Sequence, residues 1–139
     1  MSFGGYVEET ESTEIESGGW PVLSTGEFRT MRRIPSMFEE SSVVVALQAA
    51  SLGVQSQLGD LLVDGVPPAL DDLKTAVYER AVYGMAHADL LPEFATQDRK
   101  EAGENTAEDS FEQVDAFRTL AKRDISLLLG KSVNKVELI

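Results

Sequence analysis

An apolar stripe between Leu70 and Leu91 constrains the fold more than any other feature of this sequence. Apolar residues recur there at almost every fourth position, a spacing that places their side chains along one face of an α-helix. The stripe consists of Leu73, Val77, Ala81, Met85 and Ala88. Some of these residues are small and would let another helix approach closely, so we expect helix packing along the stripe.

Two helices are expected before the stripe. Ser24 and Glu27 have the spacing of a capping box, which predicts a short helix that must stop by Pro35. Apolar residues then recur at helical spacing from Ser41 to Val63, which predicts a second and longer helix. The three valines at 43–45 would also suit the start of a strand, so both interpretations of that run stay open.

Prolines separate the later helices. The pair at 67–68 forbids helical continuation and predicts a turn, and Pro92 is expected to end or kink the helix that carries the stripe. A polar connection follows over residues 96–109 and could extend either neighbouring helix, and the helical period returns over residues 111–128. The expected fold is therefore mainly α, a small helical bundle of about four helices over residues 24–131.

Residues 1–23 are expected to form a flexible acidic N-terminal arm. They contain five glutamates and neither lysine nor arginine, and such a segment buries too little apolar surface to offset its conformational entropy. Its aromatic residues include Tyr6 and Trp20, and Trp20 is the only tryptophan in the chain. Trp20 either packs back on the bundle as a cap or, with Tyr6, anchors a partner, since aromatic anchors carry much interface energy.

The C-terminal residues 132–139 mix β-branched and polar side chains, which predicts a strand. A strand with no sequential hairpin partner leaves its backbone hydrogen-bonding groups unpaired. It therefore requires an edge, either on this subunit, on another copy or on another protein. We interpret this segment as a docking strand.

Side chains that carry enzyme chemistry are scarce. The sequence has no cysteine and one histidine, His87, which lies beside the apolar stripe and is interpreted as a partly buried structural imidazole. The Glu-x-x-His motifs of carboxylate-bridged metal sites in helical bundles do not occur. We therefore expect no catalytic residue, no metal and no other cofactor, and we expect that the protein is not an enzyme.

Charge and hydropathy narrow the range of partners. The 24 acidic residues outnumber the 12 basic ones and give a formal charge of -12, which disfavours the wrapping of nucleic acid. No stretch approaches the ~20 apolar residues of a membrane-spanning helix. The N-terminal residues also lack the pattern of a secretion signal. The expectation is a soluble, intracellular protein without a membrane partner.

The segment from Tyr78 to Leu90 resembles the corresponding helix of the head completion proteins, often called gpL, of contractile-tailed temperate bacteriophages. The residues that carry the likeness are Glu79-Arg80-Ala81-Val82, then Met85-Ala86, then Ala88 and Leu90. A polar connection, an amphipathic helix with the close Leu127-Leu128-Leu129, and a short final strand follow in the family's order over roughly the last 60 residues. Upstream, the resemblance is only in the layout of the helices.

This resemblance implies a virion structural protein that completes the head as a head-to-tail connector. Copies would form a homo-oligomeric ring, a dodecamer, that binds below the portal protein after DNA packaging. The other side of the ring would meet a tail-terminator or neck protein, and DNA would pass through the lumen without specific binding. The implied location is the neck region of the virion, after synthesis in the host cytoplasm.

The resemblance also implies roles for particular residues. The docking strand would bind the portal through Val133, Val136, Leu138 and Ile139. The helices would make the contacts between subunits, and the residues expected in this packing are Arg80, Ala81, Gly84, Met85 and Ala88. The alternative function is a free acidic helical adaptor or inhibitor that binds a basic surface of its partner.

Overall fold

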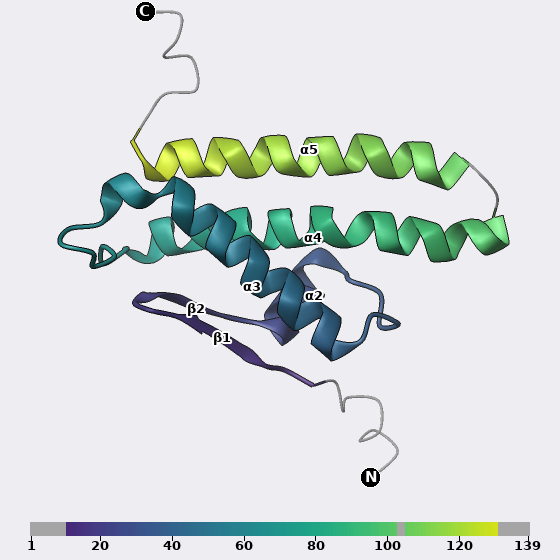
Figure 1. Cartoon of the computed structure of the whole chain (residues 1–139), viewed down its shortest axis with the longest axis horizontal. Helices are drawn as coiled ribbons and strands as arrows, with labels where there is room; N and C mark the ends of the chain where they lie inside the picture. Colours follow the sequence, from purple (N-terminus) through teal and green to yellow (C-terminus); the bar gives the residue numbers. More distant parts are fainter. Residues whose placement is uncertain (1–10, 103–104, 131–139) are drawn as a thin grey trace, which may run out of the picture.

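The computed structural model describes residues 11–102 and 105–130, without the side chains of residues 94–110 (Figure 1). In chain order its elements are β1 (Glu14–Ser17), β2 (Trp20–Ser24), α2 (Thr25–Arg32), α3 (Glu40–Gln57), the 3-10 helix η1 (Gly59–Leu61), α4 (Asp72–Ala102) and α5 (Asn105–Leu128). The predicted mainly α fold is confirmed. Tyr6 and the docking strand, with Val133, Val136, Leu138 and Ile139, lie outside the described residues.

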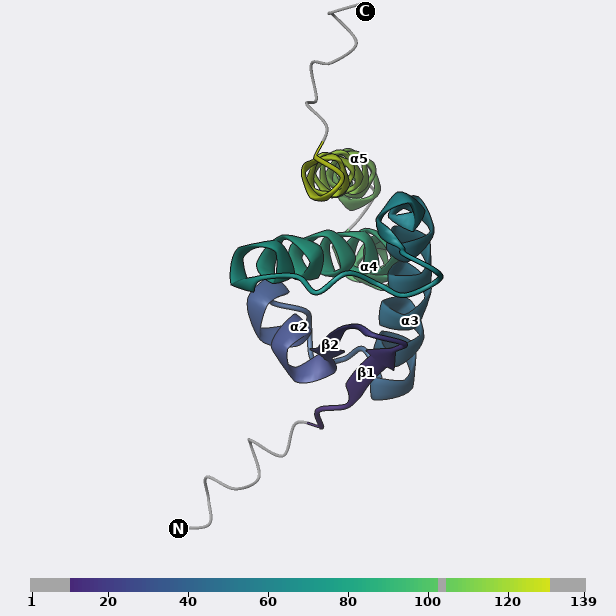
Figure 2. The same cartoon turned by 90° about the vertical axis from the view of Figure 1, so that its left-hand side faces the viewer.

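The elements stack in layers (Figures 1 and 2). α4 and α5 form a long antiparallel helical hairpin, and α3 crosses α4. The two strands lie on the side of α4 that faces away from α5. The short helix α2 follows β2 and packs against both α3 and α4. α4 is therefore the central helix, in contact with α2, α3, α5 and β2.

Residues 14–24 form a β-hairpin, which corrects the prediction of a flexible arm over residues 1–23 where the structure describes that segment. β1 and β2 are antiparallel, with Ile15 opposite Leu23. Gly18 and Gly19 join them with φ values of 47° and 97°, a left-handed conformation that glycine adopts without steric cost. Ile15, Trp20 and Leu23 are each at most 8% exposed. Burial of these side chains against the helices offsets the entropy of ordering an otherwise polar segment.

The start of α2 confirms the predicted cap by Ser24, but not the reciprocal bond of a capping box, because the backbone N–H of Ser24 donates to the Tyr83 hydroxyl at 3.2 Å. The Ser24 hydroxyl oxygen accepts a hydrogen bond from the backbone N–H of Glu27 at 3.0 Å, which satisfies one of the N–H groups left unpaired at a helix N-terminus. The helix ends at Arg32, and Arg33 has a left-handed conformation with a φ of 53°. The chain therefore leaves the helix before Pro35, as predicted.

The three valines at 43–45, which suited either a helix or a strand, lie within the helix α3. Tertiary burial decides this, because Val43 is fully buried on the face that packs into the core. The helix was predicted to reach Val63 but ends at Gln57. Gly59 lowers the helix propensity there, and a 3-10 turn follows.

α4 continues through Pro92, where the prediction placed an end or a kink, and it reaches Ala102. A proline inside a helix removes one backbone hydrogen bond and costs about 3 kcal/mol. Packing against α5 offsets this cost, because Ala88 and Leu91 are buried together with Val114 of α5. The polar segment 96–109 extends the two helices, one of the alternatives left open for it, because most of it belongs to the end of α4 and the start of α5.

One apolar core joins the strands to the helices. Tyr78 and Tyr83 of α4 are its largest fully buried side chains. Gln55 Nε2 donates to the Tyr78 hydroxyl oxygen at 2.9 Å, and the Tyr83 hydroxyl donates to Glu27 Oε1 at 2.7 Å. The polar end of each ring is therefore satisfied. Other members of the core include Ile15, Trp20, Leu23, Phe28, Val43, Leu47, Val54, Leu58, Val82, Ile125 and Leu128.

Candidate functional site

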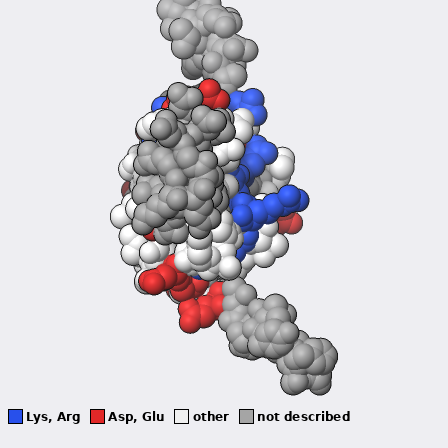
Figure 3. Space-filling view, turned by 90° about the vertical axis from the view of Figure 1, so that its right-hand side faces the viewer, with Lys and Arg blue, Asp and Glu red and all other residues white. Residues whose placement is uncertain are grey.

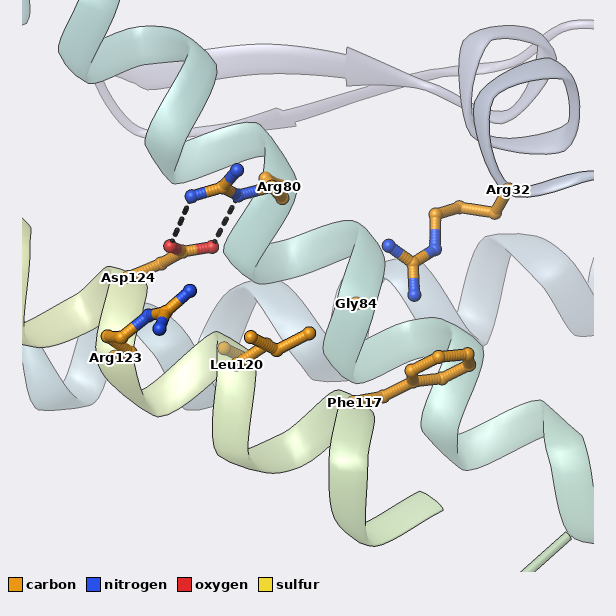
Figure 4. A pocket seen from close by; sticks show the side chains of 8 residues that line it. Arg32, Arg80, Gly84, Phe117, Leu120, Arg123 and Asp124 are labelled. Carbon is orange, nitrogen blue, oxygen red and sulfur yellow. Dashed lines mark hydrogen bonds and ion pairs between the residues drawn. The ribbon is translucent and has the colours of Figure 1, made fainter. Parts of the chain in front are cut away.

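A cleft of about 230 Å³ lies along the seam between α4 and α5, beside the end of α2 (Figure 4). We call it the arginine cleft, and the residues that define it are Arg32, Arg80, Phe117, Leu120, Arg123 and Asp124. Each of the three helices contributes an arginine to its lining. The whole chain has a formal charge of -12, so this cleft is opposite in character to the protein around it.

Arg80 is held in the cleft by a bidentate ion pair. Its Nε and Nη2 atoms donate to the two carboxylate oxygens of Asp124 at 2.9 and 2.7 Å. The Asp124 side chain is 2% exposed and the Arg80 side chain is 58% exposed. These hydrogen bonds, and then the charge of Asp124, raise the pKa of Arg80. A buried carboxylate therefore orients an arginine whose outer side still faces solvent.

Arg32 of α2 contacts both α4 and α5. Its Nε atom donates to Nδ1 of His87 at 3.1 Å. Its guanidinium carbon lies 4.7 Å from the centre of the Phe117 ring, within cation–π distance. The His87 and Phe117 rings are also in contact, with 4.7 Å between their centres. These contacts fix Arg32 at the edge of the cleft and place His87 as the partly buried structural imidazole that the sequence predicts.

His87 is expected to make the protein less stable in acid. Burial, and then the charge of Arg32, lower the pKa of His87 to about 4 from its ordinary value of 6.5. Protonation therefore favours the unfolded chain, and the free energy of unfolding should fall as the pH drops from about 6.5 to about 4. His87→Gln can still accept the hydrogen bond from Arg32 and should remove this part of the pH dependence. Urea unfolding across that pH range measures it, and an unchanged slope in the variant would contradict the assignment.

Arg123 and Leu120 form the unpartnered wall of the arginine cleft. The Arg123 side chain makes no hydrogen bond or ion pair with any residue that the structure describes. Leu120 is 49% exposed and lies one helical turn before it on α5 (Figure 4). A cation beside exposed apolar surface suits a ligand that carries both a carboxylate and apolar groups.

Charge is unevenly distributed over the surface. In Figure 3, Lys and Arg side chains gather along one side of the molecule, whereas Asp and Glu collect at its lower edge. Arg33 borders a second hollow that shares Arg32 and Phe117 with the arginine cleft. Arg118 pairs with Asp89 at 3.0 Å, but both side chains are almost half exposed. Separated regions of opposite charge favour a contact with a defined orientation.

Residues 15–139 match the family of phage head completion proteins, GPL. That range covers nearly the whole hairpin and all of the helices that the structure describes. The chain is a member of the phage head completion protein family. The probable head completion/stabilization protein of Haemophilus phage HP1 (strain HP1c1) is 30% identical to it over 151 residues, which cover 99% of each chain. No solved structure matches the chain.

Family membership confirms the resemblance that the sequence indicates and gives this head completion protein a structural role in the phage head. Of the two interpretations of Trp20, the structure supports the cap. Its indole ring is 8% exposed and stacks on the Tyr78 ring with 5.5 Å between centres. Trp20 is therefore covered within one copy, and its assignment as a partner anchor stays a prediction.

The small residues of the stripe admit a second helix, but in this head completion protein it is α5 of the same chain. Ala81 and Ala88 are fully buried, and a Cβ atom at Gly84 would lie 3.8 Å from the Phe117 carbonyl oxygen. Met85 is partly buried against the main core. Ala81 and Ala88 are therefore covered within one copy, and their part in subunit packing stays a prediction. Arg80 stays exposed, and its part in subunit packing stays a prediction.

Most of the arginine cleft could not be recognised from the sequence. Arg32, Phe117, Arg123 and Asp124 lie far from the stripe in sequence, and only the packing of α2 and α5 on α4 brings them to Arg80. One signal was present in the helical period of α5. Asp124 lies three residues after Ala121, on the face that packs into the core, where an acidic residue requires a partner.

The head completion protein exposes apolar surface on α3 as well. Val45 and Leu52 are 61% and 69% exposed on the outer face of that helix. Val45 also lines a shallow groove between α3 and α4, together with Ala49 and Leu90. Exposed apolar surface of this kind on a helix is typical of contact with another protein.

Metal binding and membrane insertion both bear on function. Within the described ranges, no cluster of three or more His, Cys, Asp or Glu side chains is arranged to hold a metal ion. Of the helices in those ranges, none combines the length and the apolar character needed to cross a membrane.

Proposed function

We propose that this head completion protein is a head-to-tail connector and not an enzyme. Its copies bind as a ring below the portal after DNA packaging, and the ring provides the attachment surface for the tail. The observation that carries the proposal is the family match over residues 15–139. The protein then acts in the neck of the virion through its surfaces and without a reacting group.

Two surfaces on the described residues support a role in assembly. The outer face of α3 offers apolar contact area at Val45 and Leu52, and the arginine cleft offers positive charge on another part of the molecule. A ring requires two different patches on each copy that fit each other, because head-to-tail contacts close into a ring when their rotation allows it.

Portal binding is assigned to residues 132–139. A strand that adds to an exposed edge gains backbone hydrogen bonds, and its alternate side chains can enter pockets. Val136 and Leu138 are two positions apart and would share one face of such a strand. One short strand binds weakly, but many strands in one ring add their binding through avidity.

Electron microscopy of purified portal mixed with the full chain tests this proposal. The expected result is an added ring of density below the portal with the twelvefold symmetry of a dodecamer. The negative charge of the protein would let DNA pass through the lumen of the ring without specific binding.

A portal that shows no added density at saturating protein would contradict the connector function. The alternative, a free acidic adaptor, predicts binding to a basic partner at low salt and no ring on the portal.

Changes in the docking strand should abolish portal binding without unfolding the protein. Deletion of residues 132–139 removes residues outside the described core, so the helical circular dichroism signal should stay unchanged. Val136→Asp with Leu138→Asp should act like the deletion, because two apolar contacts are lost. Asn134→Asp with Lys135→Asp introduces the same number of carboxylates at polar positions and should retain most of the binding. Co-sedimentation with portal measures the difference, and full binding by the deletion variant would refute the assignment.

A further inference from the structure

We propose that the arginine cleft of one copy binds the acidic segment that precedes β1 in a second copy, residues 3–11. The contact would be made between neighbours, with Glu8, Glu9 and Glu11 facing the arginines and Phe3 or Tyr6 facing the apolar wall. This inference deepens the proposed function, because it supplies a contact between subunits of the ring, but it can be tested without the portal.

The cleft has the chemistry of an acceptor for carboxylates. The Arg123 side chain has no partner among the described residues, and Arg80 is held by Asp124 with more than half of its side chain exposed. Arg32 is fixed on Phe117 at the other edge. Preorganised guanidinium groups bind carboxylates with little loss of side-chain entropy, because their geometry is already set.

The apolar part of the cleft completes the match. Leu120 is 49% exposed between Phe117 and Arg123, so the α5 wall alternates aromatic, aliphatic and cationic groups. A simple inorganic anion would leave this apolar surface exposed to water. A peptide that combines aromatic and acidic residues would cover it, and aromatic anchors contribute strongly to such contacts.

The segment before β1 has that composition. Between Phe3 and Glu11 it contains two aromatic residues, one valine, three glutamates and no basic residue. Two other stretches are acidic and contain neither lysine nor arginine. Residues 60–72 have no aromatic residue, and residues 105–117 belong to α5, the helix that forms one wall of the cleft. Charge, aromatic content and position together therefore select the N-terminal segment among the parts of this chain.

The arrangement of the layers favours a cleft that binds the N-terminal segment of a second copy over one that binds the segment of its own copy. In Figures 1 and 2 the strands lie on the side of α4 that faces away from α5, whereas the cleft lies on the α4–α5 seam. The carbonyl oxygen of Thr13 accepts a hydrogen bond from the backbone N–H of Thr25 at the start of α2, and Arg32 is at the end of that helix. To reach Arg123, the glutamates of the same copy would have to extend along α2 and around α4. A neighbouring copy needs no such path.

A labelled peptide of residues 1–12, titrated with the full chain, tests the acceptor. Fluorescence anisotropy should show binding at low salt that weakens as salt rises, because the contact is ionic and exposed. Arg123→Glu should weaken it at least tenfold. Lys122→Glu makes the same charge change at the adjacent exposed position outside the cleft and should weaken it no more than about twofold. Equal effects of both variants, or full displacement of the peptide by a short DNA duplex, would overturn the proposal.

Disulfide crosslinking separates contact between copies from contact within one copy. The chain has no cysteine, so Thr10→Cys and Leu120→Cys, which keep the glutamates and the arginines, can be placed in separate preparations and mixed. Oxidation should give covalent dimers in this mixture and many fewer when Lys122→Cys replaces Leu120→Cys. The double variant should form dimers and longer chains as the protein concentration rises. A double variant that forms only internally crosslinked monomer would refute the contact between copies.

These outcomes are independent of the test of the connector. If the full chain forms a ring on the portal but the cysteine pair forms no dimers, this inference fails and the proposed function stands. If the dimers form and no ring appears on the portal, the contact between copies stands and the connector function fails.

Discussion

Replacement of Trp20 with alanine is expected to lower the free energy of unfolding by about 3 to 4 kcal/mol. Trp20 is 8% exposed and stacks on Tyr78 with an angle of 10° between the rings. Removal of the indole ring would leave a cavity beside a fully buried tyrosine and loosen the hairpin from α4. Urea unfolding followed by far-ultraviolet circular dichroism measures the loss.

A matched change on the same strand should have little effect. Val22→Ala alters a residue that is 50% exposed on β2, and we expect it to change stability by no more than about 0.5 kcal/mol. Trp20→Phe keeps an aromatic ring on Tyr78 and should fall between the two. If Trp20→Ala is as stable as the native protein, the hairpin is not part of the core and the prediction of a flexible arm is correct after all.

Neutralisation of Glu40 is expected to have the second largest effect, a loss of about 3 kcal/mol in Glu40→Gln. The Glu40 carboxylate accepts hydrogen bonds from the hydroxyl groups of Thr13 and Thr25. It also pairs with Arg29 at 3.3 Å, and these two side chains are only 16% and 12% exposed. The change would leave a mostly buried guanidinium without its counter-charge. It would also weaken the point at which the start of the hairpin, α2 and α3 meet.

A second ion pair serves as the control for this prediction. Asp89→Asn removes the partner of Arg118, and in that pair the side chains are 45% and 46% exposed. Solvent screens such a pair, so we expect a loss of no more than about 0.5 kcal/mol. Equal losses in Asp89→Asn and Glu40→Gln would show that burial does not determine the strength of these pairs.

The contribution of the Glu40 carboxylate to the free energy of unfolding should also depend on pH. Burial alone raises its pKa, but the hydrogen bonds from Thr25, Thr13 and Arg29 and the charge of Arg29 outweigh burial, so the pKa is lowered from its ordinary 4.5. The stabilisation is therefore complete above about pH 4.5 and is lost as the pH falls through the lowered pKa of the folded protein. The difference in stability between the native protein and Glu40→Gln should shrink in the same acidic range.

These two residues show how the N-terminal region belongs to the folded unit. Trp20, next to the turn of the hairpin, packs against α4. Glu40 of α3 accepts hydrogen bonds from the segment before β1 and from the start of α2. The hairpin therefore holds a fixed place on the surface of the head completion protein. The acidic residues that precede it then start from a defined point on each copy, which a contact between neighbours in a ring requires.

Local patterns in the sequence predicted most of the helices. The spacing of Ser24 and Glu27 predicted the capped start of α2, and the stripe predicted α4. The hairpin could have been predicted as well. Gly18 and Gly19 lie between two short runs with β-branched or aromatic residues, a typical signal of a two-residue turn. The acidic composition of the segment outweighed that signal in the interpretation.

Features that depend on distant partners could not be predicted in the same way. Pro92 suggested the end of a helix, because a proline cannot donate its backbone hydrogen bond. α4 continues only because α5 packs beside it at Ala88 and Leu91. The arginine cleft depends in the same way on α2 and α5 meeting on α4, which brings together Arg32, Arg80 and Arg123.

The sequence by itself therefore determined the class of the fold, the caps and faces of its helices, and its resemblance to the head completion family. Tertiary structure alone decided that Trp20 is buried, that Ala88 of the stripe packs with Val114 of α5, and that arginines from three helices share one cleft. The physical reason is one of range. Helical periodicity and capping act between residues a few positions apart, whereas burial and ion pairing depend on which distant segments the folded chain brings into contact.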